Sequence, residues 1–276
     1  MTSLSLGYSP CPNDTYIFHA LVHGLVPCGD LAFVERLEDV ETLNQLALKG
    51  ALDLTKISFH AFGHLRNRYV LLRSGAALGR GCGPLIVADE SLSFEQLRSK
   101  TIAIPGRLTT ANLLLQLYVG GTDNLLVLPF DQIIPAVCQG RAAAGVIIHE
   151  SRFTYQQYGL EQLLDLGQWW EEVTGHPIPL GGILAKRSLG EERIRLVDQA
   201  LRHSIEYARS HPQQATSYIR QHAQELDDSV INQHIDLYVN DYSIDLGEDG
   251  LAAISCLLEK AEQVGIIATT DLPLTI

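Results

Sequence analysis

Short apolar runs rich in Val, Ile and Leu alternate with helical patterns over the first two thirds of this 276-residue chain. This alternation is typical of parallel strands joined by crossover helices, so it predicts an α/β protein. We expect strands near residues 4–9, 31–37, 54–58, 69–74, 84–88, 101–104, 125–129, 144–148 and 181–186. Helices are expected near residues 14–24, 40–49, 93–98, 109–119 and 131–139.

The pattern changes after Leu189, where the remaining segments are helical only: 191–209, 211–222, 228–242 and 248–264. Such helices need a sheet to cover, so the end of the chain is expected to pack against the sheet formed by its first strands. The sequence thus predicts a two-lobed, periplasmic-binding-protein-like (type II) α/β fold with two crossing strands at the hinge. Residues 1–87 plus 182–276 would form the larger lobe and 88–181 the smaller, with the substrate cleft between them. A single doubly wound sheet is the alternative, and both arrangements place ligands at the carboxyl ends of strands.

Acidic residues outnumber basic ones, with 32 Asp plus Glu against 20 Lys plus Arg and a formal net charge of -12. No basic run is long enough to follow a phosphate backbone, so nucleic acid is not an expected partner. The overall field would repel an anion. An acidic ligand must therefore be held by local donors such as helix N-termini, Lys or Arg.

The sequence contains no pattern for export, membrane insertion or a metal centre. Its start, MTSLSLGYSPCPND, lacks a secretory signal, and no stretch approaches the roughly 20 apolar residues of a membrane span, so we expect a cytoplasmic protein with no membrane partner. The five cysteines include no Cys-x-x-Cys pair and suit reduced thiols. Cys11 is best explained as a small buried residue, although it is also a candidate nucleophile. Two pairs of histidines at helical spacing lack a metalloprotease pattern, so no metal is expected.

Two polar segments follow predicted strands in the first half of the chain. In the turn SPCPNDT, Asn13 or Asp14 is expected to cap the next helix, while Ser9 and Asn13 face the crevice. The segment Lys56–Ser58 ends the third strand, where an open α/β sheet presents residues to its ligand. Its lysine could pair with a carboxylate; the alternative is a solvated lysine.

Two further segments lie on either side of residue 100. In PGRLTTA, a strand turns into a helix whose first turn offers backbone N–H groups and the hydroxyls of Thr109 and Thr110. One threonine is enough for a cap, so the pair favours anion binding. The glycines of GRGCGP precede a strand instead of opening a helix, which excludes a dinucleotide fingerprint and leaves no expected cofactor. Arg80 in that turn is a candidate cleft residue.

His149 stands where the apolar strand GVII enters the polar cluster HESR. Histidine is the side chain whose pKa lies nearest neutrality, so one fixed at a strand end in a closed cleft can accept a proton. Glu150 would point to the opposite face if the strand continued. Arg152 is a further candidate for ligand contact. An idle core or surface histidine is the alternative explanation.

Seven segments in order resemble the 1,4-dihydroxy-6-naphthoate synthase family of the futalosine route to menaquinone: SPCPNDTYIF, LEDVETLNQLA, LTKISF, LRSGAALGRGCGPL, PGRLTTANLLL, GVIIHESRFTY and DLGQWWEE. They extend over essentially the whole chain. The resemblance implies the two-lobed binding-protein fold. It also implies a cofactor-free carbon–carbon lyase that converts cyclic dehypoxanthine futalosine to 1,4-dihydroxy-6-naphthoate and dihydroxyacetone.

On this resemblance the catalytic general base falls on His149. The implied substrate-binding positions are Lys56, Ile57, Ser58, Thr109, Thr110 and Ala111, to which the residue patterns add Ser9, Asn13, Arg80 and Arg152. Leu108 departs from the family, in which a polar residue often precedes the threonine pair. The role of that position is therefore left open.

Two other functions are compatible with the same fold. Chorismate dehydratase of the same pathway is the alternative enzyme, but the segments SPCPNDT and IIHES argue against it. A non-catalytic small-anion binding protein would normally carry an export signal. The expected partner is therefore a small anionic carboxylate substrate. A homodimer formed through the C-terminal helices stays open.

Overall fold

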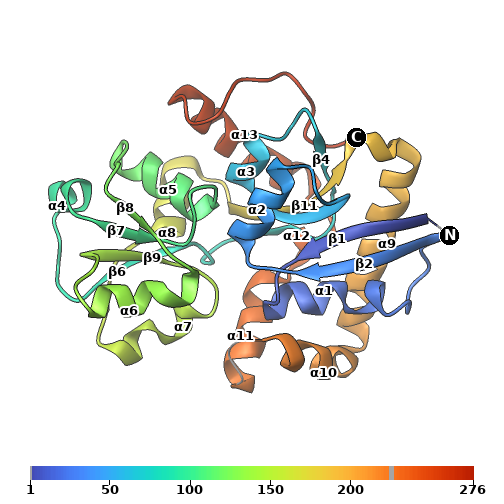
Figure 1. Ribbon diagram of the computed structural model, residues 1–276, viewed down its shortest axis with the longest axis horizontal. Coiled ribbons are helices and arrows are strands. Elements are labelled where there is room, and N and C mark those ends of the chain that lie inside the picture. Colours follow the sequence, from blue (N-terminus) through green and yellow to red (C-terminus); the bar gives the residue numbers. More distant parts are fainter. Residues whose placement is uncertain (1, 224–226) are drawn as a thin grey trace.

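The computed structural model describes residues 2–223 and 227–276, which form two separate sheets (Figure 1). The first sheet contains β1 (Thr2–Tyr8), β2 (Leu31–Leu37), β3 (Leu54–Ser58), β4 (Tyr69–Leu71), β5 (Ala77–Gly79) and β11 (Ile178–Lys186). The second contains β6 (Leu85–Ala88), β7 (Ile102–Ile104), β8 (Leu125–Val127), β9 (Ala144–Ile147) and β10 (Glu161–Asp165). Their orders are β2-β1-β3-β11-β4, with β5 also on β11, and β10-β6-β9-β7-β8.

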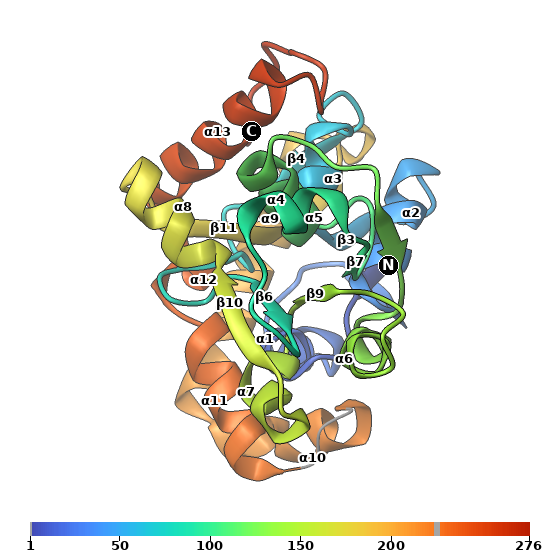
Figure 2. The same ribbon diagram turned by 90° about the vertical axis from the view of Figure 1, so that its left-hand side faces the viewer.

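Helices surround each sheet, as the view of the second sheet's side shows (Figure 2). Those before residue 190 are α1 (Pro12–Val22), α2 (Val40–Leu48), α3 (Phe59–Gly63), α4 (Phe94–Ser99), α5 (Thr110–Val119), α6 (Ile133–Cys138), α7 (Ser151–Thr154) and α8 (Leu166–Thr174). Those after it are α9 (Glu191–Ser210), α10 (Pro212–His222), α11 (Asp228–Tyr238), α12 (Asp241–Ile244) and α13 (Gly247–Gln263). Because α9, α10 and α11 pack around α1, the end of the chain returns to the first sheet.

The sequence pattern was wrong about one long helix near the end of the chain. Instead of one helix over 228–242, α11 ends at Tyr238 and α12 begins at Asp241. Asn240 separates them because its side chain caps α12, accepting a hydrogen bond from the N–H of Tyr242. This break leaves Tyr238 at the last turn of its helix.

The chain crosses between the sheets twice, from β5 to β6 and from β10 through α8 to β11. The crossings touch at Gly83 and Gly167, where a Cβ on Gly83 would lie 2.3 Å from the Cα of Gly167. Only glycine allows two backbones to approach so closely. Arg152 holds the same point by donating to the carbonyls of Gly81 and Gly83 and, at 2.7 Å, to Asp165.

Parallel pairing directs two strand ends of each sheet toward the same space. In the first sheet β1 is parallel to β3, and their carboxyl ends lead to Ser9 and Ser58. In the second, β7 is parallel to β9, and their carboxyl ends lead to Thr109 and His149. The polar residues that follow the strands therefore collect where the two lobes face each other.

A single buried apolar cluster joins the two lobes beside this space. It includes Phe59 and Phe62 of α3, Leu113 and Leu114 of α5, and Leu257 of α13. Across residues 2–223 and 227–276, no helix combines the length and apolar character that a bilayer crossing requires.

Candidate active site

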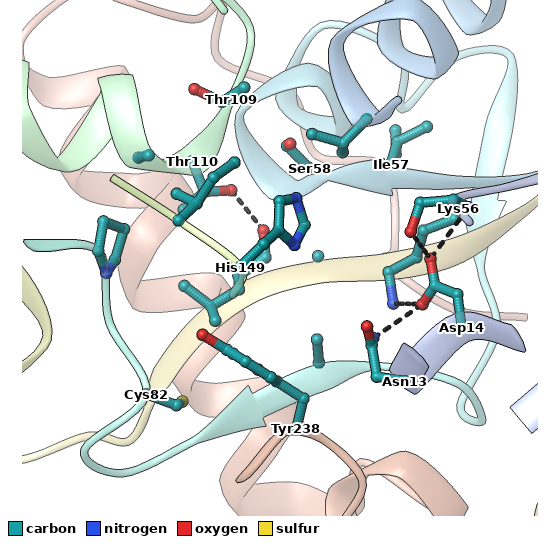
Figure 3. A pocket seen from close by; sticks show the side chains of 18 of the residues that line it. Asn13, Asp14, Lys56, Ile57, Ser58, Cys82, Thr109, Thr110, His149 and Tyr238 are labelled. Carbon is teal, nitrogen blue, oxygen red and sulfur yellow. Dashed lines mark hydrogen bonds and ion pairs between the residues drawn. The ribbon is translucent and has the colours of Figure 1, made fainter. Parts of the chain in front are cut away.

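A cavity lies between the two lobes (Figure 3). From the first lobe, the sequence-predicted residues that line it are Ser9, Asn13, Lys56, Ile57 and Ser58. From the second lobe, they are Thr109, Thr110, Ala111 and His149. Residues predicted from four separate strand ends thus meet in one place.

His149 has an unusual backbone conformation that follows the end of β9. Its φ is 56°, in the left-handed region, and it is the one non-glycine residue with positive φ in the described chain. Such a conformation costs on the order of 1 to 3 kcal/mol and is concentrated at functional sites. The turn ends the strand at Ile147, so Glu150 does not occupy the opposite strand face. Instead its carboxylate lies in one group with the Cys11 sulfur and a His149 ring nitrogen, all within 4.8 Å of one another.

The surroundings of His149 keep its imidazole neutral. Burial lowers its pKa to about 4, an effect that the Asp14 carboxylate partly opposes and the Lys56 ammonium adds to. Its Nδ1 lies 3.5 Å from Cys11 Sγ, and the ring of Phe130 meets it edge-on at 5.1 Å between centroids. At neutral pH the ring therefore has a lone pair with which to accept a proton.

Cys11 has a base beside it, which sequence reasoning did not detect. Burial, reinforced by the nearby Glu150 carboxylate, raises the pKa of its thiol well above the ordinary value. Since the thiolate is the nucleophilic form, this sulfur is not activated for attack. Its position makes it a contact of His149.

Lys56 pairs with a carboxylate of the protein. Its Nζ lies 3.1 Å from Asp14 Oδ1 and donates to the carbonyl of Gly75 at 3.3 Å. Asp14 also accepts from the N–H and hydroxyl of Ser9, at 3.2 and 2.7 Å, and from Asn13 Nδ2 at 2.9 Å. The pair is almost fully buried, with 8% and 2% of the two side chains exposed. The cavity wall therefore carries a compensated ion pair.

The expected cap of the first helix was wrong. The helix α1 begins at Pro12, and Cys11 occupies the cap position without a side-chain hydrogen bond. Proline suits the first helical position because its missing N–H would have no intrahelical partner there. Asn13 and Asp14, which were expected to cap, use their side chains in the network around Lys56 instead.

The N-terminus of α5 presents backbone donors to the cavity. The hydroxyl of Thr109 caps the helix by accepting from the N–H of Asn112 at 3.2 Å. The hydroxyl of Thr110 donates to the carbonyl of Leu180 at 2.5 Å. The N–H groups of Thr110 and Ala111 meet no acceptor in the described part of the chain. These two N–H groups, at the positive end of the helix dipole, can donate hydrogen bonds to an anion in the cavity.

Ser58 adds a side-chain donor across the cavity. Its Oγ accepts from Asn44 Nδ2 at 3.3 Å, and its backbone N–H donates to Asn44 Oδ1 at 3.0 Å. The buried asparagine thus fixes the serine from two sides. Because the Oγ acts as an acceptor there, its own hydrogen is available to a ligand.

Three predicted or questioned residues lie outside the cavity lining. Arg80 is exposed and donates to the Gly175 carbonyl at 2.9 Å. Arg152 belongs to the contact between the two crossings described above. Leu108 packs against the shared apolar cluster, and its backbone N–H donates to Glu41 at 3.2 Å. Its apolar side chain is thus accounted for by packing.

The cavity also contains residues that sequence reasoning did not select. Asp14, Cys82, His234 and Tyr238 all line it. His234 and Tyr238 come from α11, four residues apart and hence on one helix face. In the sequence this stretch reads as an ordinary covering helix. Only the packing of α11 beside α1 brings its polar residues to the site.

Known sequences match the chain over nearly its full length. A family model described as menaquinone biosynthesis matches residues 4–263. A 1,4-dihydroxy-6-naphtoate synthase from Thermus thermophilus is 54% identical over 99% of both chains. A protein of the same name from Streptomyces coelicolor is 45% identical, covering 96% of this chain and 95% of its own.

Solved structures support the fold. A protein from Archaeoglobus fulgidus is 38% identical, with a TM-score of 0.90 over 96% of this chain and 98% of its own. An alkanesulfonate-binding protein from Xanthomonas axonopodis has a TM-score of 0.71 at 14% identity, covering 98% of this chain and 95% of its own. At 14% identity, this structural similarity is evidence for the fold alone. It confirms the predicted two-lobed binding-protein architecture. The resemblance predicted from seven sequence segments is also confirmed: the chain is an enzyme that belongs to the menaquinone biosynthesis family.

Proposed function

We propose that this enzyme is a carbon–carbon lyase that converts cyclic dehypoxanthine futalosine to 1,4-dihydroxy-6-naphthoate and dihydroxyacetone, with His149 as general base. The observation that carries the proposal is the neutral imidazole of His149, held on a left-handed turn in a cavity with anion donors. The names of the two relatives, at 54% and 45% identity, support the same reaction.

The substrate carboxylate is held by neutral donors in this proposal. The N–H groups of Thr110 and Ala111 approach it from the second lobe, and the hydroxyl of Ser58 approaches it from the first. The macrodipole of the ten-residue α5 favours negative charge at this end. Lys56 contributes little net charge, because Asp14 already compensates it. Local dipoles thus bind an anion although the whole chain carries a formal charge of -12.

His149 removes a proton from the bound substrate and starts its fragmentation. Formation of the aromatic naphthoate makes the fragmentation favourable. In this proposal the substrate bound between the lobes displaces water from the cavity, which strengthens the electrostatic interactions and limits side reactions. A positioned general base of this kind typically contributes about 100- to 10 000-fold to the rate.

A product assay tests the proposal. Purified enzyme given cyclic dehypoxanthine futalosine, without an added cofactor, is expected to form 1,4-dihydroxy-6-naphthoate, followed by absorbance and liquid chromatography. Chorismate is offered in a parallel reaction. Consumption of chorismate alone would identify the dehydratase activity, and tight binding of the futalosine derivative without turnover would identify a binding protein. Either result would refute the lyase.

Thr110→Pro is expected to raise KM about tenfold or more relative to Thr110→Ala. Proline deletes the backbone N–H but suits the first helical position, and Thr109 before it already has the extended backbone that proline requires, with φ -71° and ψ 148°. A hydrogen bond to a charged group contributes about 1.5 to 3 kcal/mol. Steady-state kinetics of the two variants measure the difference.

Alanine is the matched control because both variants lose the hydroxyl bond to Leu180, while only proline loses the N–H. Equal KM values in the two folded variants would show that the substrate carboxylate does not bind at this helix end.

A further inference from the structure

We propose that Tyr238 donates a hydrogen bond to the substrate oxygen that gains negative charge as the carbon–carbon bond breaks. This inference rests on the proposed lyase function and adds a residue to its site. The phenol stands at the last turn of α11, which belongs to the C-terminal helices and follows the base by almost ninety residues in the sequence.

The position of Tyr238 is the first argument. Tyr238 is 8% exposed, lines the cavity together with His149, and extends its side chain into the space between the lobes (Figure 3). Charged and polar groups near it come from both lobes: Cys11 and Cys82 from the first lobe and the crossing, and Glu150 and Arg152 from the turn that carries His149. The phenol and the base therefore share one cavity.

The second argument concerns the hydroxyl of Tyr238, which has no hydrogen-bond partner among the described residues. Within residues 2–223 and 227–276, it makes no hydrogen bond to side chain or backbone, whereas buried tyrosine hydroxyls usually find a partner. Burial raises the pKa of this phenol, with Cys82 adding to the effect and Arg152 opposing it. The group thus keeps its hydrogen at neutral pH and has a ligand as its natural acceptor.

His234 fixes the phenol in place from one turn earlier on α11. The two rings lie 4.7 Å apart between centroids at 48°. His234 is fully buried, and its Nε2 lies 2.9 Å from Asn13 Oδ1. Because Asn13 Nδ2 donates to Asp14, its oxygen must accept from His234, so Nε2 carries the hydrogen. This bond fastens α11 to the first turn of α1 and holds Tyr238 toward the cavity.

The reaction needs such a donor. When a base takes a proton from the substrate, the electron pair left behind forms a new double bond in the part that becomes the aromatic product, as the carbon–carbon bond next to a carbonyl breaks. The electron pair of that broken bond passes to the departing fragment. It rests there on the carbonyl oxygen as an enolate. Tyr238 shares its hydrogen with that oxygen and keeps it, and the proton taken by His149 returns to the fragment. The step is balanced without any further reactant, and preorganised donors of this kind stabilise the developing charge.

Tyr238→Phe is expected to lower kcat about 100-fold, with KM within about twofold of wild type. The matched control is Tyr242→Phe. The hydroxyl of Tyr242 donates to Asp249 at 2.6 Å outside the cavity lining, so its loss is expected to leave kcat and KM unchanged. Circular dichroism and the thermal midpoint check that both variants are folded.

Unchanged kcat in folded Tyr238→Phe overturns the inference. So does a raised KM with kcat retained, since that result assigns the phenol to ground-state binding. If the phenylalanine variant does not fold, a trifluorotyrosine at position 238 keeps the hydroxyl and lowers its pKa. Its kcat should then decline toward alkaline pH while the wild-type kcat does not, and identical profiles overturn the inference. Failure of the wild type to form naphthoate refutes the lyase function instead.

Discussion

His149→Asn is expected to lower kcat about 100- to 10 000-fold, with a much smaller effect on KM. Asparagine is suitable because it tolerates the left-handed conformation that His149 adopts at φ 56°, so the turn is retained while the base is lost. Substrate contacts from the other lobe are not altered by this change. Steady-state kinetics on a variant with wild-type circular dichroism measure the effect.

The pH profile of the wild-type enzyme tests the same base independently. The pKa of His149 lies at about 4, below its ordinary value, so the imidazole is unprotonated above that pH and becomes protonated below it. We expect kcat/KM to stay level with respect to this group between pH 8 and 6 and to fall as the pH drops through about 4. Half-loss near pH 6.5 would contradict a shielded base.

His64→Asn serves as the control for the histidine replacement. His64 is exposed, packs only against the ring of His60 among the described aromatic contacts, and lies outside the cavity lining. Its loss is expected to leave kcat within about twofold of wild type, because surface substitutions usually have small effects. If the folded His149→Asn variant kept the wild-type kcat, His149 would not be the general base.

Much of the fold could be predicted because its elements are strongly periodic. The strands that flank the cavity are short and largely apolar, and polar residues such as Ser58 or His149 stand at their last position or just after it. Parallel pairing brings carboxyl ends of strands to one edge, so strand-end residues are cavity candidates before any contact is known. By contrast, β5 and β10 escaped prediction. They pair in antiparallel fashion at the sheet margins and have no clear pattern of their own.

The remainder of the site depends on tertiary contacts that sequence spacing does not encode. Lys56 reads as a solvated or ligand-binding lysine until α1 is placed beside β3, where Asp14 becomes its partner. Glu150 lies in one group with Cys11 and His149, and not on the opposite strand face, because the left-handed conformation of His149 ends the strand. Tyr238 enters the cavity only because α11 packs against α1 and ends at that residue. Each of these depends on where a helix lies relative to a sheet, which periodicity leaves open.

Lys56→Met is expected to destabilise the protein by about 3 to 5 kcal/mol, because it leaves the carboxylate of Asp14 buried without its cation. For a chain of this size that loss corresponds to a fall in thermal midpoint of roughly 10 °C. Ser9 and Asn13 would still donate to the carboxylate, but neither carries charge. Denaturant unfolding and thermal melts measure the change.

Two control experiments test whether burial makes the Lys56–Asp14 ion pair stronger than a more exposed one. Lys186 lies 3.1 Å from Asp53, the same separation as in the Lys56 pair, but 22% and 28% of those side chains are exposed. Lys186→Met should therefore cost at most about 1 kcal/mol. Adding Asp14→Asn to Lys56→Met removes the stranded charge and should recover part of the lost stability, which a double-mutant cycle reports as coupling. If both lysine variants lost equal stability, burial would not set the strength of the pair. If the Lys56 variant kept its stability but bound substrate poorly, the lysine would serve the ligand rather than the fold.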